Sequence, residues 1–131
     1  MSHKPQILVA EDDFDDRYIM TETFREIGFD RLKIVEDGTL IMEYLTVEGV
    51  EAVKLIVLDL NMPKLGGTGT LSKLKENSEF QNIPVIIFST SVNIVEKDIC
   101  MKLGAQEYIM KPSAHTDYIE TCRKFHKFTL C

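Results

Sequence analysis

The hydrophobic pattern of the chain changes repeatedly between two periods, and the order of these changes predicts the fold. Short aliphatic runs typical of buried strands alternate with segments whose apolar residues recur at helical spacing. The predicted strands are residues 6–11, 32–37, 53–59, 83–89 and 106–110. The predicted helices are residues 15–27, 38–49, 71–78, 93–104 and 114–128. Five strands alternating with five helices predict an α/β fold, a three-layer (βα)5 sandwich with a parallel sheet between two helical layers.

The third strand and the fourth helix have the clearest patterns. Residues 53–59, VKLIVLD, are aliphatic almost throughout, as expected of a strand that is covered on both faces. Asn93 and Glu96 form an N-cap and capping-box pair at the start of the fourth helix. The apolar stripe of this helix consists of Val95, Ile99 and Leu103. The third helix is weaker, because Gly69 near its start costs about 1 kcal/mol relative to alanine.

Polar side chains stand at the ends of four of the predicted strands. They are Glu11, Asp12 and Asp13 after the first strand, Asp59 after the third, Ser89 to Ser91 after the fourth and Lys111 after the fifth. In open parallel sheets, ligands bind beyond the carboxyl ends of the strands. If the third strand lies between the first and the fourth, each about 5 Å away, Asp59 lies between the acids and the hydroxyl. Lys111 is then about 10 Å away, a gap that its long side chain can largely close.

This combination of residues predicts phosphoryl chemistry with a metal ion. Carboxylates that converge in a partly desolvated cleft repel by a few kcal/mol for each close pair, so positive charge must offset them. Lys111 supplies one charge, and Mg²⁺ suits the remaining ligands because they are all oxygens. A carboxylate beside Mg²⁺, an ammonium and a hydroxyl is suited to attack phosphorus and form an acyl phosphate. Asp59 is the expected nucleophile.

Each of these residues also has a simpler interpretation when it is considered alone. An acid after a strand is often a helix N-cap, and this role stays open for Asp15 and Asp16. Ser89 alone is compatible with a loop hydroxyl, and Lys111 alone with a surface charge. The functional interpretation rests on their joint occurrence at the ends of strands.

Charge restricts the class of partner. Fifteen Lys and Arg against 21 Asp and Glu give a net charge of −6, which disfavours contact with phosphate backbones, so we expect no nucleic-acid partner. The basic cluster at residues 122–128 is CRKFHKF. At helical spacing, Tyr118, Cys122 and Phe125 share one face and the basic residues the other. This spacing favours a helix packed on the sheet, with a dimer interface as the alternative.

Length and hydropathy predict a cytoplasmic protein of one domain, residues 1–131. No apolar run approaches the roughly 20 residues of a membrane span, and no signal-peptide segment precedes the first strand. We therefore expect no membrane partner. Cys100, Cys122 and Cys131 are too widely spaced for a CxxC pair and are expected to be reduced.

With these residues assembled, the sequence resembles the receiver domain of two-component response regulators along essentially its whole length. The likeness is carried by ILVAEDD at residues 7–13, LDLNMP at 58–63, PVIIFS at 84–89 and EYIMKP at 107–112. One departure is Gly66, where the family usually has an acid, and it implies a looser loop after the third strand. The STS run at residues 89–91 is closer to stand-alone receivers similar to phytochrome-partner regulators.

The resemblance implies a flavodoxin-like fold with strand order 2-1-3-4-5. The implied metal ligands are Glu11, Asp12, Asp59 and Asn61, with Asp12 a direct ligand and Asn61 binding through its backbone carbonyl. The implied phosphorylation residues are the phosphoacceptor Asp59, the switch hydroxyl Ser89, the switch aromatic Tyr108 and the phosphate-binding Lys111. The bond between Lys111 and Pro112 is often cis in the family.

A receiver of this kind accepts a phosphoryl group from a sensor histidine kinase or a phosphotransfer protein. The resemblance implies signalling through the face of the fourth helix, fifth strand and fifth helix, where Tyr108 would enter space that Ser89 vacates. Tyr108 as an ordinary strand aromatic is the alternative, and phosphorylation-dependent homodimerisation stays open. We expect no enzyme activity beyond slow self-dephosphorylation.

Two other functions compete with this one. A small Mg²⁺-dependent aspartyl-phosphate phosphatase usually needs a second aspartate two residues after the nucleophile, where this chain has Asn61. A pseudo-receiver would bind partners without being phosphorylated.

Overall fold

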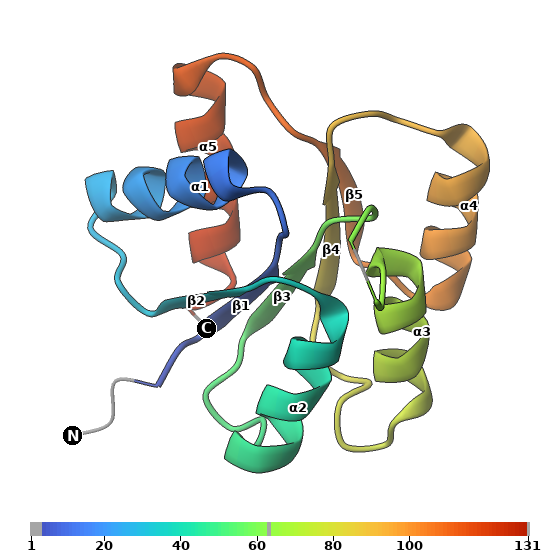
Figure 1. The fold of residues 1–131 in the computed structure, drawn as a ribbon. Helices are drawn as coiled ribbons and strands as arrows, with labels where there is room; N and C mark the ends of the chain where they lie inside the picture. Colours follow the sequence, from blue (N-terminus) through green and yellow to red (C-terminus); the bar gives the residue numbers. More distant parts are fainter. Residues whose placement is uncertain (1–3, 63, 131) are drawn as a thin grey trace.

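The structure is a computed structural model that describes residues 4–62 and 64–130, and Figure 1 shows its elements. The strands are β1 (Ile7–Ala10), β2 (Leu32–Val35), β3 (Leu55–Leu58), β4 (Val85–Ser89) and β5 (Glu107–Met110). The helices are α1 (Phe14–Glu26), α2 (Gly38–Glu48), α3 (Gly67–Glu76), α4 (Ile94–Leu103) and α5 (His115–Lys127). Strands and helices alternate throughout, as the sequence pattern predicts. Pro63 of the LDLNMP motif and Cys131 lie outside the described residues.

The five strands form one parallel sheet in the order β2-β1-β3-β4-β5. Helices α1 and α5 cover one face, and α2, α3 and α4 cover the other (Figure 1). Every residue of β1, β3 and β4 is buried, whereas the edge strands β2 and β5 are only partly covered. The flavodoxin-like fold and its strand order are therefore confirmed. Among the described residues, no helix combines the length and the apolar character that crossing a membrane requires.

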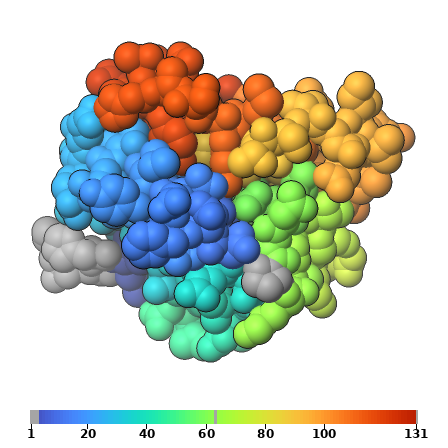
Figure 2. All heavy atoms as spheres, turned by 45° about the horizontal axis from the view of Figure 1, so that its top comes forward, coloured from blue at the N-terminus to red at the C-terminus, as the bar shows by residue number. Residues whose placement is uncertain are grey.

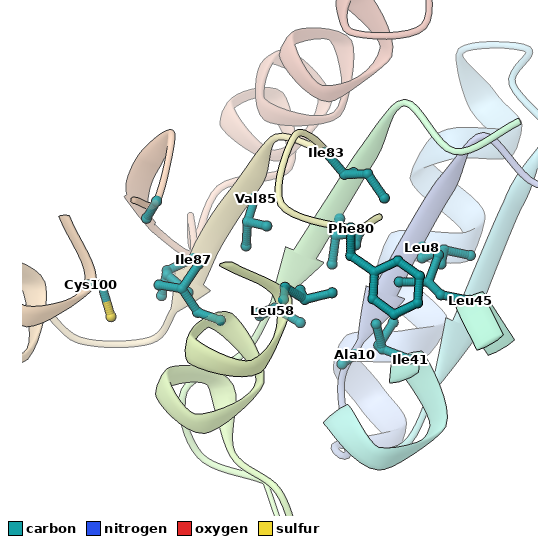
Figure 3. Packing of buried hydrophobic residues seen from close by; sticks show 14 of the residues in the cluster. Leu8, Ala10, Ile41, Leu45, Leu58, Phe80, Ile83, Val85, Ile87 and Cys100 are labelled. Carbon is teal, nitrogen blue, oxygen red and sulfur yellow. The ribbon is translucent and has the colours of Figure 1, made fainter. Parts of the chain in front are cut away.

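Each face of the sheet carries its own hydrophobic core. On the side of α2, α3 and α4, helical side chains such as Ile41 and Leu45 pack against alternate strand residues (Figure 3). On the other side, the buried residues of α5 are Tyr118, Cys122 and Phe125. The ring of Phe88 on β4 meets Phe125 edge-on, with 5.4 Å between ring centroids. The predicted packing of α5 on the sheet is confirmed.

Helix α4 begins and ends where the sequence predicts, but most of its apolar stripe does not face the core. Asn93 accepts a hydrogen bond from the backbone N–H of Glu96 at 3.0 Å, and Gly104 ends the helix at a φ of 109°. Yet Val95 is 68% exposed and Ile99 44% exposed, while Cys100 is fully buried. Val95 and Ile99 therefore lie on the surface, because α4 packs against its neighbours through the side that carries Cys100, and of the stripe only Leu103 packs against the core.

Helix α3 starts in close contact with the backbone that follows β3. The N–H of Gly67 donates to the carbonyl of Leu60 at 3.1 Å. A Cβ atom at Gly67 would lie 2.4 Å from the carbonyl oxygen of Asp59, so only glycine fits without displacing this backbone. Gly69 lies inside α3, and a Cβ atom there would meet the end of the flexible Leu65 side chain at 2.9 Å.

We therefore expect Gly67→Ala to lower the free energy of unfolding by about 2 kcal/mol, as overpacking against a fixed backbone does. Gly69→Ala is the matched control and should raise the free energy of unfolding by about 0.5–1 kcal/mol, because alanine loses less backbone entropy in a helix. Urea unfolding followed by circular dichroism measures both, since the chain has no tryptophan. Similar effects of the two substitutions would contradict the close contact at Gly67.

Candidate phosphoacceptor site

The polar residues that follow the strands meet at the carboxyl edge of the sheet. Ala10 pairs with Leu58, so Glu11 and Asp59 leave β1 and β3 side by side. The N–H of Asp59 donates to the carbonyl of Ala10 at 3.1 Å, which continues the ladder to the edge. In Figure 2, the blue start of α1 lies at the centre of this face, next to the green segment after β3. The sheet itself therefore positions these side chains.

Three carboxylates form a cluster that suits a hard cation. One oxygen each of Glu11, Asp12 and Asp59 lie within 4.8 Å of one another. Glu11 and Asp59 are buried, whereas Asp12 is exposed, so the cluster is open to solvent on one side. Oxygen-only ligands of this kind fit Mg²⁺ or Mn²⁺. Asn61 is exposed two residues after Asp59, at the same edge.

Lys111 brings an ammonium group into this acidic cluster. Its side chain is only 7% exposed. The Nζ atom hydrogen-bonds the carboxylate of Glu11 and lies 2.8 Å from Asp16 Oδ2. It lies 3.8 Å from Asp59 Oδ2, which is an ion pair but too long for a hydrogen bond. The long stem of Lys111 thus closes the gap between β5 and the acids after β1 and β3.

The surroundings shift the proton affinities of Glu11 and Lys111. Burial raises the pKa of Glu11 from its ordinary 4.5 to about 7, and the opposing effect of Lys111 does not cancel it. Burial lowers the pKa of Lys111, but its hydrogen bonds to Asp16 and Glu11 outweigh burial, so this pKa is raised. Lys111 is therefore charged at neutral pH, while Glu11 is close to its midpoint.

The start of α1 corrects one prediction about its acids. The N-cap is Asp13, whose carboxylate accepts the N–H of Asp16 at 2.9 Å, and neither Asp15 nor Asp16 is the cap. Asp16 lies three residues after the cap, inside the helix, where its side chain binds Lys111 instead. Arg17 closes the turn from β1 by donating to the carbonyl oxygens of Glu11 and Asp12 at 3.2 and 2.7 Å.

Ser89 and Tyr108 lie on β4 and β5, the two strands that follow β3 in the sheet. Ser89 is 1% exposed at the last position of β4, and its carbonyl accepts the N–H of Lys111 at 2.6 Å. Tyr108 is 9% exposed, and its hydroxyl donates to the carbonyl of Ser91 at 3.0 Å. The Lys111–Pro112 bond is not cis, so the isomer that is frequent in the family does not occur here.

Sequence reasoning missed the contribution of Asp16 and Arg17 to this site. The sequence did contain a signal for this contribution, because in the run EDDFDDR the acids that follow β1 continue into the first turn of α1. A side chain in the first turn of a helix after a strand can turn back to the strand end. Spacing alone did not separate Asp15, which is exposed, from Asp16, which reaches Lys111.

Comparisons with known proteins show the family to which this chain belongs. Residues 7–123 match the response regulator receiver domain family. The two-component response regulator ARR7 of Arabidopsis thaliana is 34% identical over 114 residues, which cover 81% of this chain and 55% of that protein. The chain therefore spans about half the length of that relative.

Two solved receivers share the fold over nearly their full length. The phosphorylated cyanobacterial phytochrome response regulator RcpA has a TM-score of 0.84 at 28% identity, covering 97% of this chain and 94% of that one. The Mn²⁺-bound form of response regulator Rcp1 has a TM-score of 0.79 at 29% identity, covering 93% and 91%. The chain belongs to the response regulator receiver domain family.

The raised pKa of Glu11 makes a prediction for the metal-free protein. The folded state holds this proton more tightly than the unfolded state, so its contribution to stability is complete below about pH 4.5 and is lost as pH rises through about 7. We expect the contribution of Glu11 to the free energy of unfolding to fall by about 3 kcal/mol across this range. Urea unfolding at several pH values in a chelator measures it.

Glu11→Gln is the control, because glutamine keeps the shape of the side chain but cannot titrate. The difference in unfolding free energy between wild type and Glu11→Gln should change with pH over this window. A constant difference would show that Glu11 is not desolvated as described.

Proposed function

We propose that this receiver accepts a phosphoryl group on Asp59 from a sensor histidine kinase or a phosphotransfer protein. One observation carries the proposal. The buried Asp59 carboxylate lies 3.8 Å from the Lys111 ammonium and has an oxygen within 4.8 Å of oxygens of Glu11 and Asp12. Phosphoryl transfer depends mainly on positioning and on neutralising charge, and these residues can supply both.

The reaction would form one bond and break another at phosphorus. An Asp59 carboxylate oxygen attacks the phosphorus of a phosphohistidine, the P–O bond forms, and the P–N bond breaks. The departing imidazole nitrogen takes a proton from solvent. Lys111 hydrogen-bonds one phosphoryl oxygen, and Ser89 can donate its hydroxyl to another. Hydrolysis returns the receiver to its unphosphorylated state, because water attacks phosphorus and releases inorganic phosphate and the free Asp59 carboxylate.

We propose that Mg²⁺ is held by Glu11, Asp12, Asp59 and the backbone carbonyl of Asn61. The bound ion supplies positive charge for the phosphoryl oxygens and for the crowded carboxylates. The oxygen-only cluster supports this assignment. Mn²⁺, the metal bound to the similar receiver Rcp1, also prefers oxygen ligands.

We propose that the signal leaves through the surface of α4, β5 and α5. Tyr108 on β5 holds the loop after β4 through its bond to Ser91, only two residues from Ser89. Movement of Ser89 toward a phosphoryl group would disturb this hydrogen bond. It would thereby shift the populations of the conformations of the loop after β4 and of the Tyr108 ring. The exposed side chains of Ile94 and Val95 offer an apolar contact for a partner on this surface.

We propose no hydrolysis of external phosphate esters. Asn61 occupies the position where aspartyl-phosphate phosphatases usually carry an acid, and an amide cannot exchange a proton as general acid or base. A steady-state assay with generic phosphate esters tests this proposal, and sustained turnover would overturn it.

Incubation with Mg²⁺ and a small phosphodonor should add one phosphoryl group to the wild type, detected as an acid-labile adduct by mass spectrometry. Asp59→Asn should add none, because the amide is not a nucleophile. Asp12→Asn should react at least several-fold more slowly and need more Mg²⁺, because a ligand is lost. Equal labelling of the Asp59→Asn variant would remove Asp59 from the mechanism.

Fluoroberyllate, a phosphoryl mimic, should change the tyrosine fluorescence of the wild type in the presence of Mg²⁺. The change should be smaller in Tyr108→Phe and in Ser89→Ala, because the first variant lacks the proposed reporter and the second lacks its proposed link to the phosphoryl group. Tyr44→Phe, a substitution away from the site, is the matched control. A full response in Tyr108→Phe would exclude Tyr108 as the switch.

A further inference from the structure

Asp16 holds the lysine that the proposed reaction needs. Lys111 has three N–H donors, and two of them bond Glu11 and Asp16. The distance from Nζ to Asp16 is 2.8 Å, a full angstrom less than the 3.8 Å to Asp59. The Lys111 ammonium therefore hydrogen-bonds Glu11 and Asp16, whereas its contact with the proposed phosphoacceptor Asp59 is only a longer ion pair.

The start of α1 fixes Asp16 in this position. Its backbone N–H donates to the N-cap Asp13, and Arg17 ties the first turn to the carbonyls after β1. The side chain of Asp16 is 25% exposed, so part of its charge is screened by solvent. Breaking its bond to Lys111 is then less costly than leaving a fully buried carboxylate without a partner.

A second donor lies close to Asp16 and has no partner. Asp16, Lys111 and Tyr118 line one cavity of about 410 Å³. Tyr118 is 5% exposed, and among the described residues its hydroxyl is the only buried side-chain polar atom without a hydrogen bond. An unpaired buried hydroxyl costs free energy that a new hydrogen bond would recover. Burial chiefly, and the nearby charge of Asp16 in part, raise the pKa of Tyr118, which therefore stays a donor.

We propose that Asp16 is a positioning residue that holds Lys111 in the resting state and releases it to the phosphoryl group, after which the Tyr118 hydroxyl donates to the freed carboxylate. This inference rests on the proposed phosphorylation of Asp59. The exchange changes only hydrogen bonds, so it adds no covalent step to the phosphoryl transfer. Asp16 thus opposes phosphorylation, and Tyr118 offsets part of that opposition.

The binding of fluoroberyllate to Asp59 in excess Mg²⁺ tests the exchange. Asp16→Asn should bind it more tightly than wild type by about threefold to tenfold, the range for one hydrogen bond. The same substitution should lower the stability of the unliganded protein, because the resting ion pair is lost. Structural damage would instead lower both quantities. Asp16→Glu, which keeps the carboxylate, should restore affinity toward the wild-type value.

Asp15→Asn is the matched control, because it removes the same charge from the same turn without touching Lys111. It should leave the affinity within about twofold of wild type, as expected for a screened surface charge. Equal tightening in Asp15→Asn and Asp16→Asn would reduce the effect to net charge and overturn the inference.

Tyr118→Phe tests the second half of the exchange. It should weaken fluoroberyllate binding when Asp16 is present and have no further effect in the Asp16→Asn background. The same effect in both backgrounds would overturn the role of Tyr118. If wild type binds no fluoroberyllate at Asp59, the proposed function fails. If wild type binds it but Asp16→Asn does not bind it more tightly, only the present inference fails.

Discussion

The ammonium of Lys111 among three carboxylates is the interaction on which the site depends. Glu11, Asp16 and Asp59 all approach Nζ, so the contacts combine three negative charges with one positive charge. Two unit charges at such distances interact by roughly 4 kcal/mol near a protein surface, which makes the imbalance costly. Burial chiefly, and the nearby charge of Asp59 in part, raise the pKa of Glu11. The excess of negative charge is what the proposed cation would offset.

The sheet maintains this unfavourable arrangement because its central strands are completely buried. Neighbouring strands β1 and β3 are joined by a backbone ladder that runs to Asp59, so Glu11 and Asp59 cannot move apart without breaking that ladder. The backbone contact of Gly67 fixes the segment after β3 from the other side. This rigidity keeps the like charges close together at the carboxyl edge of the sheet. The two hydrophobic cores supply the folding free energy that offsets their repulsion.

Particular elements show where sequence patterns were sufficient and where they were not. The alternation of strands and helices, the Asn93 cap and the packing face of α5 followed from local signals. The packing face of helix α4 did not follow from local signals. The sequence showed which positions of this helix are apolar, but not which side of the helix is buried. Val95 and Ile99 are exposed, while Cys100 is buried. A helical period gives the width of an apolar face, but neighbouring elements decide whether that face is covered.

The sequence by itself determined the (βα)5 order and placed acids, hydroxyl and amine at the strand ends, because these features depend on local periodicity. Strand order was available only through family resemblance. Tertiary structure alone decided how the acids share Lys111. Asp15 and Asp16 look alike in the sequence, yet only Asp16 reaches Nζ, and Asp13 takes the cap. That division of roles depends on where α1 begins relative to β5, a relation between segments about a hundred residues apart that no local pattern encodes.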